Sequence, residues 1–392
     1  MDALTKLLRL PETEKQSRGL LNTPAEIAQQ PATWRSTVEL FRKRQREIME
    51  FFNASGLGSD PQDSPVVWLV GAGTSDYLGR CLAQLLRRLW QCEVLAVPST
   101  DLLTHLDQLL LPRKRYLWIS FSRSGDSPEG VAVLARALKR FPAIRHLVVS
   151  CNRDGQMVQL LKEHHNTLAV ILDESVNDRG LAMTSSFTNM LVFGHCLAHF
   201  ASFEVYEAML EKLSSAGRDL LAPAADTADM MASGEYTQAC FLGSGPLRAV
   251  AQESALKLLE MTAGQISTMA ESTLGLRHGP MAALNSSTLL VSYLSADETV
   301  RNYELDLLRE IGSKNLVRTR IAISPDSTSQ GGSFAEYCLQ TATGLKDDYI
   351  PPVSVIFGQL LGLFFSLRFG LRPDCPSPNG AIARVVQNVA LH

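Results

Sequence analysis

Trp68-Leu-Val-Gly-Ala-Gly73 recurs further along the chain as Cys240-Phe-Leu-Gly-Ser-Gly245, a shift of 172 residues (from 68 to 240). At the same shift, Leu117-Trp-Ile-Ser120 aligns with Leu289-Leu-Val-Ser292. A short apolar run that ends in glycines is typical of a buried parallel strand that turns tightly into a helix. Two such motifs repeated in the same order predict a duplicated α/β domain.

Strand and helix signals alternate around the first of these motifs. Each apolar run is followed by a loop and a segment with helical periodicity, which is the βαβ pattern of a parallel sheet flanked by helices. The strands that we expect in the first half cover residues 66–70, 93–97, 116–121, 146–150 and 168–172.

Length and repeat together predict the domain organisation of the 392 residues. We expect an N-terminal helical segment (1–53, helical over 25–30 and 33–52), a first α/β domain (54–215) that begins with a linker at 55–64, a second α/β domain (216–371) and a C-terminal tail (372–392) that follows a proline-rich break at 373–380. The apolar run 353–367 is interrupted by Gly358, Gln359 and Gly362 and is too short to cross a bilayer about 30 Å thick, so it predicts a buried helix.

Charge and cysteine content exclude several classes of protein. A formal net charge of −3 gives no reason to expect binding to nucleic acid or to an anionic membrane, so an anionic ligand would need a local site. The seven cysteines occur singly, with no CxxC pair, and the N-terminal 20 residues lack the apolar core of a signal peptide. These features predict a cytoplasmic protein.

A serine-rich loop follows the strand expected at 116–121. Ser122, Ser124 and Ser127 surround Gly125 between that strand and a helix, where backbone N–H groups and a helix dipole favour an anion, and Arg123 adds a positive charge. A phosphate fits this loop, although a plain serine helix cap fits one such loop equally well. The same positions of the second copy, 294–299, lack the pattern of hydroxyls.

Two further loops are expected at the same edge of the sheet. Ligands of open parallel sheets lie beyond the carboxyl ends of the strands, so Gly73, Thr74 and Ser75 are candidate ligand contacts, with Thr184 and Ser185 as a third edge. Asp76 occupies the place of the third glycine of GxGxxG, which argues against a nicotinamide cofactor. No triphosphate-binding loop and no metal-ligand spacing of histidines occurs in the sequence, so we expect neither a cofactor nor a metal.

The second half supplies the candidate acid and base groups. Glu253, Lys257 and Glu260 are spaced i, i+4 and i+7, on one face of a helix. Spacing alone favours an exposed Glu–Lys pair, whereas a carboxylate beside a lysine in a cleft would be a proton-transfer base. His278 precedes Gly-Pro and is expected in a loop, either as a surface residue without a role or as a group that moves a proton near neutral pH.

Together these motifs resemble the sugar isomerase (SIS) fold family over nearly the whole chain. With two SIS domains, the chain is most similar to the AgaS group, the galactosamine-6-phosphate deaminase/isomerases also labelled tagatose-6-phosphate ketose/aldose isomerases. The resemblance implies two tandem flavodoxin-like domains, and a homodimer or higher homo-oligomer in which His278 is contributed by the partner subunit. The stretches that carry it are 71–75, 120–127, 253–260 and 277–280, with 23–34 and 271–280 resembling the AgaS group in particular.

Similarity to the isomerase half of glucosamine-6-phosphate synthase implies roles for these residues. The serines at 75, 122, 124 and 127 would bind the sugar phosphate, with Thr184 or Ser185 near the hydroxyls. Glu260 would be the base at C2, His278 would open the ring, and Glu253 and Lys257 would hold substrate and assist proton transfer. The synthase tail presents a lysine to the sugar, whereas the stretch 374–387 contains Arg384. Arg384 would bind the substrate, but it stays protonated and cannot form a Schiff base.

The reaction that the resemblance implies is deamination with isomerisation of an amino-sugar 6-phosphate in amino-sugar catabolism, galactosamine 6-phosphate giving tagatose 6-phosphate and ammonia. The glutamine-hydrolysing domain of the synthase has no counterpart ahead of these motifs, so ammonia is expected to be released. Plain aldose/ketose isomerisation and a non-catalytic sugar-phosphate regulator are the alternatives. An etherase for lactyl sugar phosphates is disfavoured, since it usually has one SIS domain.

Overall fold

The computed structural model describes residues 1–58, 63–325, 334–341, 344–386 and 389–391. Residues 59–62 of the predicted linker and residues 387, 388 and 392 of the predicted tail lie outside this part. The described chain divides into two compact units. The first-sheet unit comprises Ala32–Asp178, Ser185–Leu210 and Ala383–His392, and the second-sheet unit comprises Met1–Pro31, Arg179–Thr184 and Glu211–Ile382. The domain boundaries expected near 53, 215 and 371 stay a prediction.

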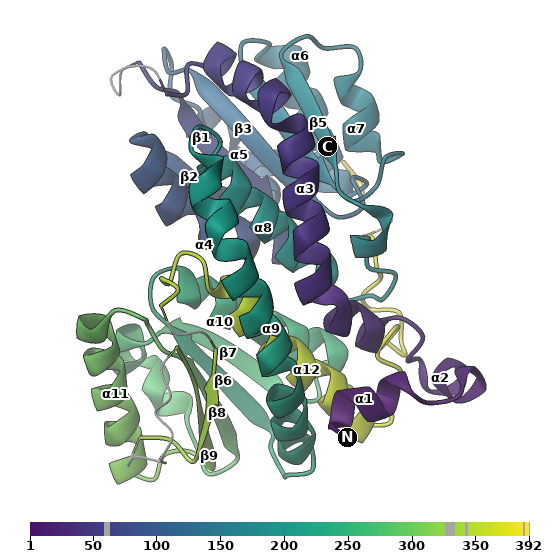
Figure 1. Ribbon diagram of the computed structural model, residues 1–392, viewed down its shortest axis with the longest axis vertical. Coiled ribbons are helices and arrows are strands. Elements are labelled where there is room, and N and C mark those ends of the chain that lie inside the picture. Colours follow the sequence, from purple (N-terminus) through teal and green to yellow (C-terminus); the bar gives the residue numbers. More distant parts are fainter. Residues whose placement is uncertain (59–62, 326–333, 342–343, 387–388, 392) are drawn as a thin grey trace. The chain divides into compact units, whose positions relative to one another are not determined.

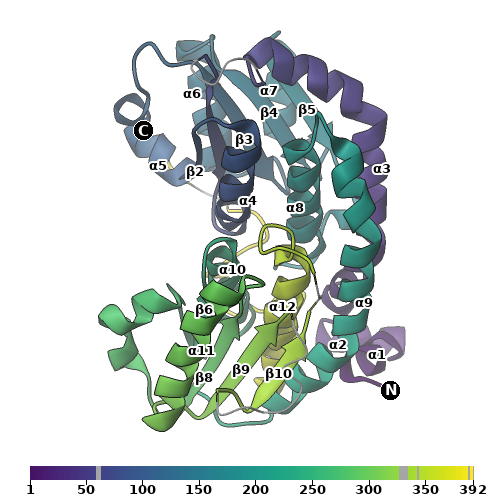
Figure 2. The same cartoon turned by 60° about the vertical axis from the view of Figure 1, so that its left-hand side comes forward.

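The first-sheet unit contains a five-stranded parallel sheet in the order β2-β1-β3-β4-β5. This confirms the expected parallel sheet, with each predicted strand shifted by one residue at most. Helix α4 packs against α8, and α5 packs against α6 (Figures 1 and 2). The strands are β1 (Val66–Gly71), β2 (Val94–Pro98), β3 (Tyr116–Ser122), β4 (Arg145–Ser150) and β5 (Thr167–Ile171), and the helices are α4 (Thr74–Trp90), α5 (Ser99–Leu109), α6 (Pro128–Arg140), α7 (Gln156–Leu161), η1 (Glu174–Val176) and α8 (Ser185–Ala198).

The second-sheet unit contains another five-stranded parallel sheet, in the order β7-β6-β8-β9-β10. Counted along the chain, both sheets have the order 2-1-3-4-5 of flavodoxin-like folds. The strands are β6 (Gln238–Gly243), β7 (Ser267–Ser272), β8 (Thr288–Tyr293), β9 (Thr319–Ser324) and β10 (Tyr337–Gln340), and the helices are α1 (Ala3–Leu8), α2 (Glu12–Arg18), α10 (Pro246–Met261), η2 (Leu274–His278), η3 (Pro280–Ala283), α11 (Glu298–Ser313) and α12 (Pro351–Arg368).

Two long helices contribute residues to both units. Helix α3 (Thr23–Ser55) continues through Pro31, where we expected two separate helical stretches. Proline has no N–H with which to bond the carbonyl oxygen of Ile27, but the side chain of Gln30 donates to that oxygen at 3.0 Å. The helix therefore continues without an unsatisfied carbonyl at this position. The other long helix is α9 (Phe203–Ala232).

Helix α12 is the buried helix predicted from the apolar run at 353–367. By length and composition alone it is the one helix among the described residues that could cross a membrane, and 89% of it is buried inside the fold. Gly358 and Gly362 permit close packing on α10, because a Cβ at Gly358 would lie 2.2 Å from the hydroxyl of Ser254 and one at Gly362 would lie 3.0 Å from the carbonyl oxygen of Lys257. Burial of α12 thus helps to bury the face of α10 that carries Lys257.

Candidate active site

The phosphate-binding residues expected in the first half lie at the switch point of the first sheet, where β1 pairs with β3. Helix α4 begins at Thr74, and its cap Gly73 has φ 54° and ψ −122°, a conformation that suits glycine. A Cβ on Gly71 would lie 2.5 Å from the backbone of Ser75, so the turn closes only with glycine there. Thr74 and Ser75 are buried in the first turn. This geometry belongs to a ligand edge of an open parallel sheet.

Two hydroxyls of the serine loop accept hydrogen bonds from backbone N–H groups of the same loop. The Gly125 N–H donates to Ser122 Oγ at 3.0 Å, and the Asp126 N–H donates to Ser124 Oγ at 3.1 Å. A hydroxyl that accepts one such bond still has its hydrogen to donate. Ser127 caps α6, and its hydroxyl donates to Glu129 Oε2. Ser122, Ser124 and Ser127 are all half-buried.

Two residues that sequence reasoning missed shape this loop from the end of β4. The Asn152 side chain donates to the carbonyl oxygen of Ser124 at 2.8 Å. Gly155 lies so near the loop that a Cβ there would approach the same carbonyl oxygen to 2.5 Å. An asparagine and a glycine after a strand read simply as a turn in the sequence, so only the fold identifies their target.

Arg123 and Arg384, both predicted to bind substrate, are joined to each other within the first-sheet unit. Arg123 Nη2 donates to the carbonyl oxygen of Arg384 at 2.5 Å. The guanidinium group of Arg384 donates to the carbonyl oxygen of Asp178 at 2.7 Å and to the Asn177 side chain at 2.8 Å. These bonds attach the tail to the serine loop and to the segment that follows η1. Whether either arginine also contacts substrate stays a prediction.

Asp178, also missed from the sequence, organises the segment that contains Ser185. Its carboxylate accepts hydrogen bonds from the N–H groups of Ser185 and Ser186 at 3.0 and 2.8 Å, and from the Ser186 hydroxyl at 2.5 Å. It therefore caps α8. Thr184 and Ser185 are completely buried, and the carbonyl oxygen of Thr184 accepts a hydrogen bond from Gln359 within the second-sheet unit. Their expected contact with sugar hydroxyls stays a prediction.

The three charged residues expected on one helical face form a linked set on α10, within the second-sheet unit. Lys257 Nζ lies 2.6 Å from Glu260 Oε2 and 3.4 Å from Glu253 Oε1. The side chains of Glu253 and Lys257 are 0% and 1% exposed, whereas that of Glu260 is 23% exposed. The interpretation as an exposed Glu–Lys pair is therefore wrong. Of the two carboxylates paired with the lysine, Glu260 is the one that solvent reaches.

His278 ends the short 3₁₀-helix η2 and is exposed, so the loop expected around it is wrong in part. The preceding stretch 270–272 belongs to β7, and Leu276 is buried in the core that α11 also covers, which fixes one helical turn before Gly279. Arg277 pairs with Glu310 of α11 at 2.8 Å and anchors this turn. Within the described part of the chain, no hydrogen bond or ion pair of His278 is found.

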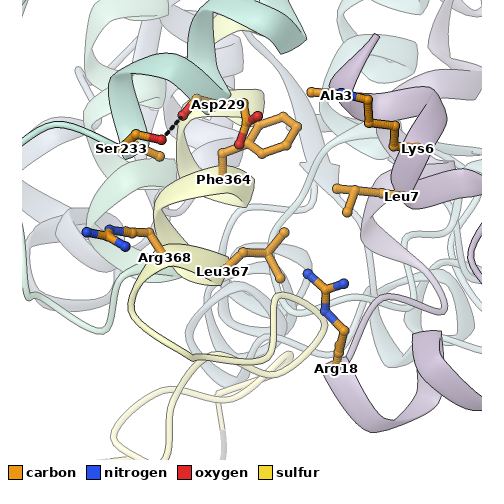
Figure 3. Close-up of a pocket in the computed structure, with 10 residues that line it drawn as sticks. Ala3, Lys6, Leu7, Arg18, Asp229, Ser233, Phe364, Leu367 and Arg368 are labelled. Carbon is orange, nitrogen blue, oxygen red and sulfur yellow. Dashed lines mark hydrogen bonds between the residues drawn. The ribbon is translucent and has the colours of Figure 1, made fainter. Parts of the chain in front are cut away.

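A pocket of about 250 Å³ lies elsewhere in the second-sheet unit, between α1, α2, α9 and the end of α12 (Figure 3). It includes none of the residues predicted to be catalytic. Its three cationic side chains are exposed, and one of them, Arg18, pairs with Glu14. The lining residues are Ala3, Lys6, Leu7, Arg18, Asp229, Ala232, Ser233, Phe364, Leu367 and Arg368.

The predicted site residues thus form two sets, one in each unit. The serine loop, the Gly73–Ser75 turn and the tail arginine belong to the first-sheet unit, and the charged face of α10 and His278 belong to the second-sheet unit. The first set can hold an anion through hydroxyls and the start of a helix. The second set can take up and return a proton through a partly exposed carboxylate beside a buried ammonium group.

Known proteins resemble this chain over nearly its full length, although no family model matches it. It is 35% identical over 325 residues, 83% of this chain and 84% of the relative, to the D-galactosamine-6-phosphate deaminase AgaS of Escherichia coli O157:H7. It is 32% identical over 377 residues, 95% of this chain and 92% of the relative, to the AgaS deaminase of Shewanella sp. strain ANA-3. The solved structure of tagatose-6-phosphate ketose/aldose isomerase from Escherichia coli matches with a TM-score of 0.84 and 31% identity, covering 94% of this chain and 96% of that one. The chain belongs to the AgaS family of SIS-fold proteins.

Proposed function

We propose that the chain is an enzyme that deaminates and isomerises an amino-sugar 6-phosphate, converting galactosamine 6-phosphate to tagatose 6-phosphate and ammonia. The names of the relatives support this substrate and this reaction. The observation that carries the chemistry lies on α10. There the buried Lys257 is hydrogen-bonded to Glu260, the carboxylate of the linked set that solvent reaches.

The proposed reaction begins with the sugar phosphate on the hydroxyls of Ser122, Ser124 and Ser127, and the Ser127 hydroxyl exchanges its bond to Glu129 for one to the phosphate. Neutral donors at the start of a helix hold a dianion without a large positive charge. His278 protonates the ring oxygen while water takes the proton of the C1 hydroxyl, which opens the ring to the aldehyde. Arg123, Ser75 and the segment at 184–185 are assigned to the substrate as supporting contacts.

Glu260 then removes the proton from C2 and returns a proton to C1. The C1 aldehyde and the C2 amine pass through an enolamine, which becomes a C1 alcohol with an imine at C2. Water adds to this ketimine, and the carbon–nitrogen bond breaks to give the C2 ketone and ammonia. Lys257 balances the charge of Glu260 through the transfer, and Glu253 holds Lys257 in place.

The organisation around this reaction completes the proposal. We infer that the two α/β halves, 54–215 and 216–371, arose by duplication of one SIS domain, which the common shift of 172 residues and the common strand order support. The active form is a homodimer or a higher homo-oligomer in which His278 serves the partner's site, and the exposure of His278 in the single chain is consistent with this. The enzyme works in the cytoplasm, in the catabolism of N-acetylgalactosamine, and without cofactor or metal.

Ammonia release tests the proposed function directly. Purified protein is supplied separately with galactosamine 6-phosphate and glucosamine 6-phosphate, without metal or nucleotide and in the presence of EDTA. Release with the galacto substrate as the better one is the expected result. Interconversion of tagatose 6-phosphate with its aldose, without ammonia from either amino sugar, would show a plain isomerase, and binding without turnover would show a regulator.

A further inference from the structure

The two sheets repeat each other residue by residue at the edge where the phosphate is expected. The pairing of β1 with β3 begins at Val66 and Tyr116, and the pairing of β6 with β8 begins at Gln238 and Thr288. Both pairs differ by the same 172 residues. The loop after β8 is therefore the counterpart of the serine loop after β3, with Ser295 and Ala296 in the places of Arg123 and Ser124.

In the second sheet, carboxyl groups of the protein itself receive the donors of this loop. The Ser295 N–H donates to Glu304 Oε2 at 2.8 Å, and the Ala296 N–H donates to Asp347 Oδ1 at 2.6 Å. The Ser295 hydroxyl donates to Asp347 Oδ2 at 2.5 Å. Successive amides and a hydroxyl that converge on acidic oxygens are the donor set by which such loops bind phosphate.

The arrangement joins three elements. Glu304 comes from α11, Asp347 from the segment before α12, and Ser295 from the loop after β8. Glu304 and Ser295 are completely buried. Arg301 Nη1 donates to the carbonyl oxygens of Ser295 and Ala296 at 2.8 and 3.1 Å, which holds the loop with its N–H groups toward the carboxyl groups. These contacts make a built anion cradle that is already filled.

We propose that Glu304 and Asp347 stand in for a bound anion in the second sheet, so that each chain binds one sugar phosphate and not two. The inference rests on the proposed function in one respect, since that function assigns the sugar phosphate to the serine loop of the first sheet. Asp347 contributes two acceptor oxygens and is the principal substitute for the anion. Removing its side chain therefore reopens a cradle that inorganic phosphate can fill.

The test is rescue of stability by inorganic phosphate in the full-length protein. Asp347→Ala is expected to lower Tm by roughly 5 °C, because it leaves the buried Ser295 hydroxyl and the half-buried Ala296 N–H without their acceptors. Phosphate, compared with chloride at equal ionic strength, is expected to restore about half of this loss beyond its effect on the unchanged protein. If Asp347→Ala folds only when phosphate is present, that too is rescue.

Two matched variants distinguish filling of the cradle from other effects. Asp347→Asn keeps an acceptor for the Ala296 N–H and refills the space without charge, so a smaller loss of Tm and no rescue are expected. Asp348→Ala removes the adjacent carboxylate, which none of these hydrogen bonds involves, and should not be rescued. Equal rescue of either control and of Asp347→Ala would overturn the proposal.

The serine loop must be separated from the second cradle. Rescue of Asp347→Ala should persist when Ser124→Ala is added, and its loss in the double variant would show that phosphate acts through the first sheet, which overturns the proposal. Calorimetric titration of the unchanged protein with the sugar phosphate should give one site per chain, and two sites would also overturn it. Failure of the proposed function would appear as the absence of ammonia release. The rescue of Tm by phosphate could still be measured in that case.

Discussion

Lys257 Nζ lies 2.6 Å from Glu260 Oε2, in an ion pair whose lysine is buried and whose carboxylate solvent reaches. The same ammonium group lies 3.4 Å from the buried carboxylate of Glu253. One positive charge thus serves two carboxylates in different surroundings. This difference divides their roles, since a group that moves a proton to and from a substrate must be reached by it.

Replacing Glu260 by Gln should abolish turnover and leave substrate binding unchanged. The amide keeps the shape and a hydrogen-bond partner for Lys257 but cannot accept the C2 proton, so kcat should fall on the order of 10³-fold. Ammonia release measures the loss, and calorimetry measures binding. Glu253→Gln is the matched control. It should lower Tm, and its kcat should fall less than that of Glu260→Gln. Turnover retained in Glu260→Gln would remove the assignment of Glu260 as the base.

Replacing Ser124 by Ala should weaken recognition of the phosphate group. Its hydroxyl accepts from the Asp126 N–H and can donate to the ligand, and a hydrogen bond to a charged group contributes about 1.5–3 kcal/mol, so KM should rise roughly 10- to 100-fold. Galactosamine without the phosphate serves as the control, since its weak binding should not change. An equal effect on both sugars would show that the variant damages the loop rather than a phosphate contact.

The bonds between the serine loop and the tail predict that Arg123 and Arg384 act as one unit. Arg384→Met removes the bonds to Asp178 and Asn177, and Arg123→Met removes the bond to the Arg384 carbonyl oxygen. Each variant should raise KM, and the double variant should be no worse than the worse single one, because both break the same connection. Additive losses of KM would instead indicate that each arginine binds the substrate separately.

The sequence predicted the sheets well because their signals are local. Apolar runs that end in glycine, together with the repeated motif, were enough to place β1 and β6 and to expect flanking helices. The burial of Lys257 could not be predicted in this way, because it depends on the close packing of α12, about 100 residues further along the chain, at Gly358 and Gly362. In the sequence these two glycines only interrupted an apolar run.

The same limit applies to the polar contacts of the candidate site. Asp178 and Asp347 receive backbone N–H groups from loops that fold back onto them, and nothing in their immediate sequence marks them as acceptors. The loop after β8 lacks the serine pattern, so sequence comparison identified the loss of hydroxyls but not the carboxyl groups that replaced the ligand. Long-range hydrogen bonds of this kind follow from tertiary structure and not from local pattern.

Glu304 makes the stability of the protein dependent on pH. Burial raises the pKa of its carboxyl group to about 7, and the charge of Asp347 acts in the same direction. Hydrogen bonds from Ser244 and Ser295 and the charge of Arg301 act to lower this pKa. A carboxyl group whose pKa rises on folding favours the folded state below its unfolded value of 4.5, and this contribution is lost as the pH rises through about 7.

Glu304→Gln should therefore stabilise the protein, relative to the unchanged protein, more at pH 8 than at pH 5. The amide cannot ionise and can still accept from the Ser295 N–H, so the gain at pH 8 should exceed the gain at pH 5 by roughly 2.5 kcal/mol, the part of the pKa difference that falls between these two pH values. Thermal unfolding at both pH values measures it. A difference in Tm between variant and unchanged protein that does not depend on pH would contradict the assignment.

Mixing two inactive variants tests whether His278 serves the site of the partner subunit. Glu260→Gln and His278→Ala homodimers should each be nearly inactive. Subunit exchange gives mixed dimers in which the site with Glu260 receives His278 from the other chain, and about a quarter of the unchanged activity returns, because half of the dimers are mixed and each has one competent site. If both residues act within one chain, every site in a mixed dimer lacks one of them. No activity would then return, and His278 would have to be assigned to its own subunit.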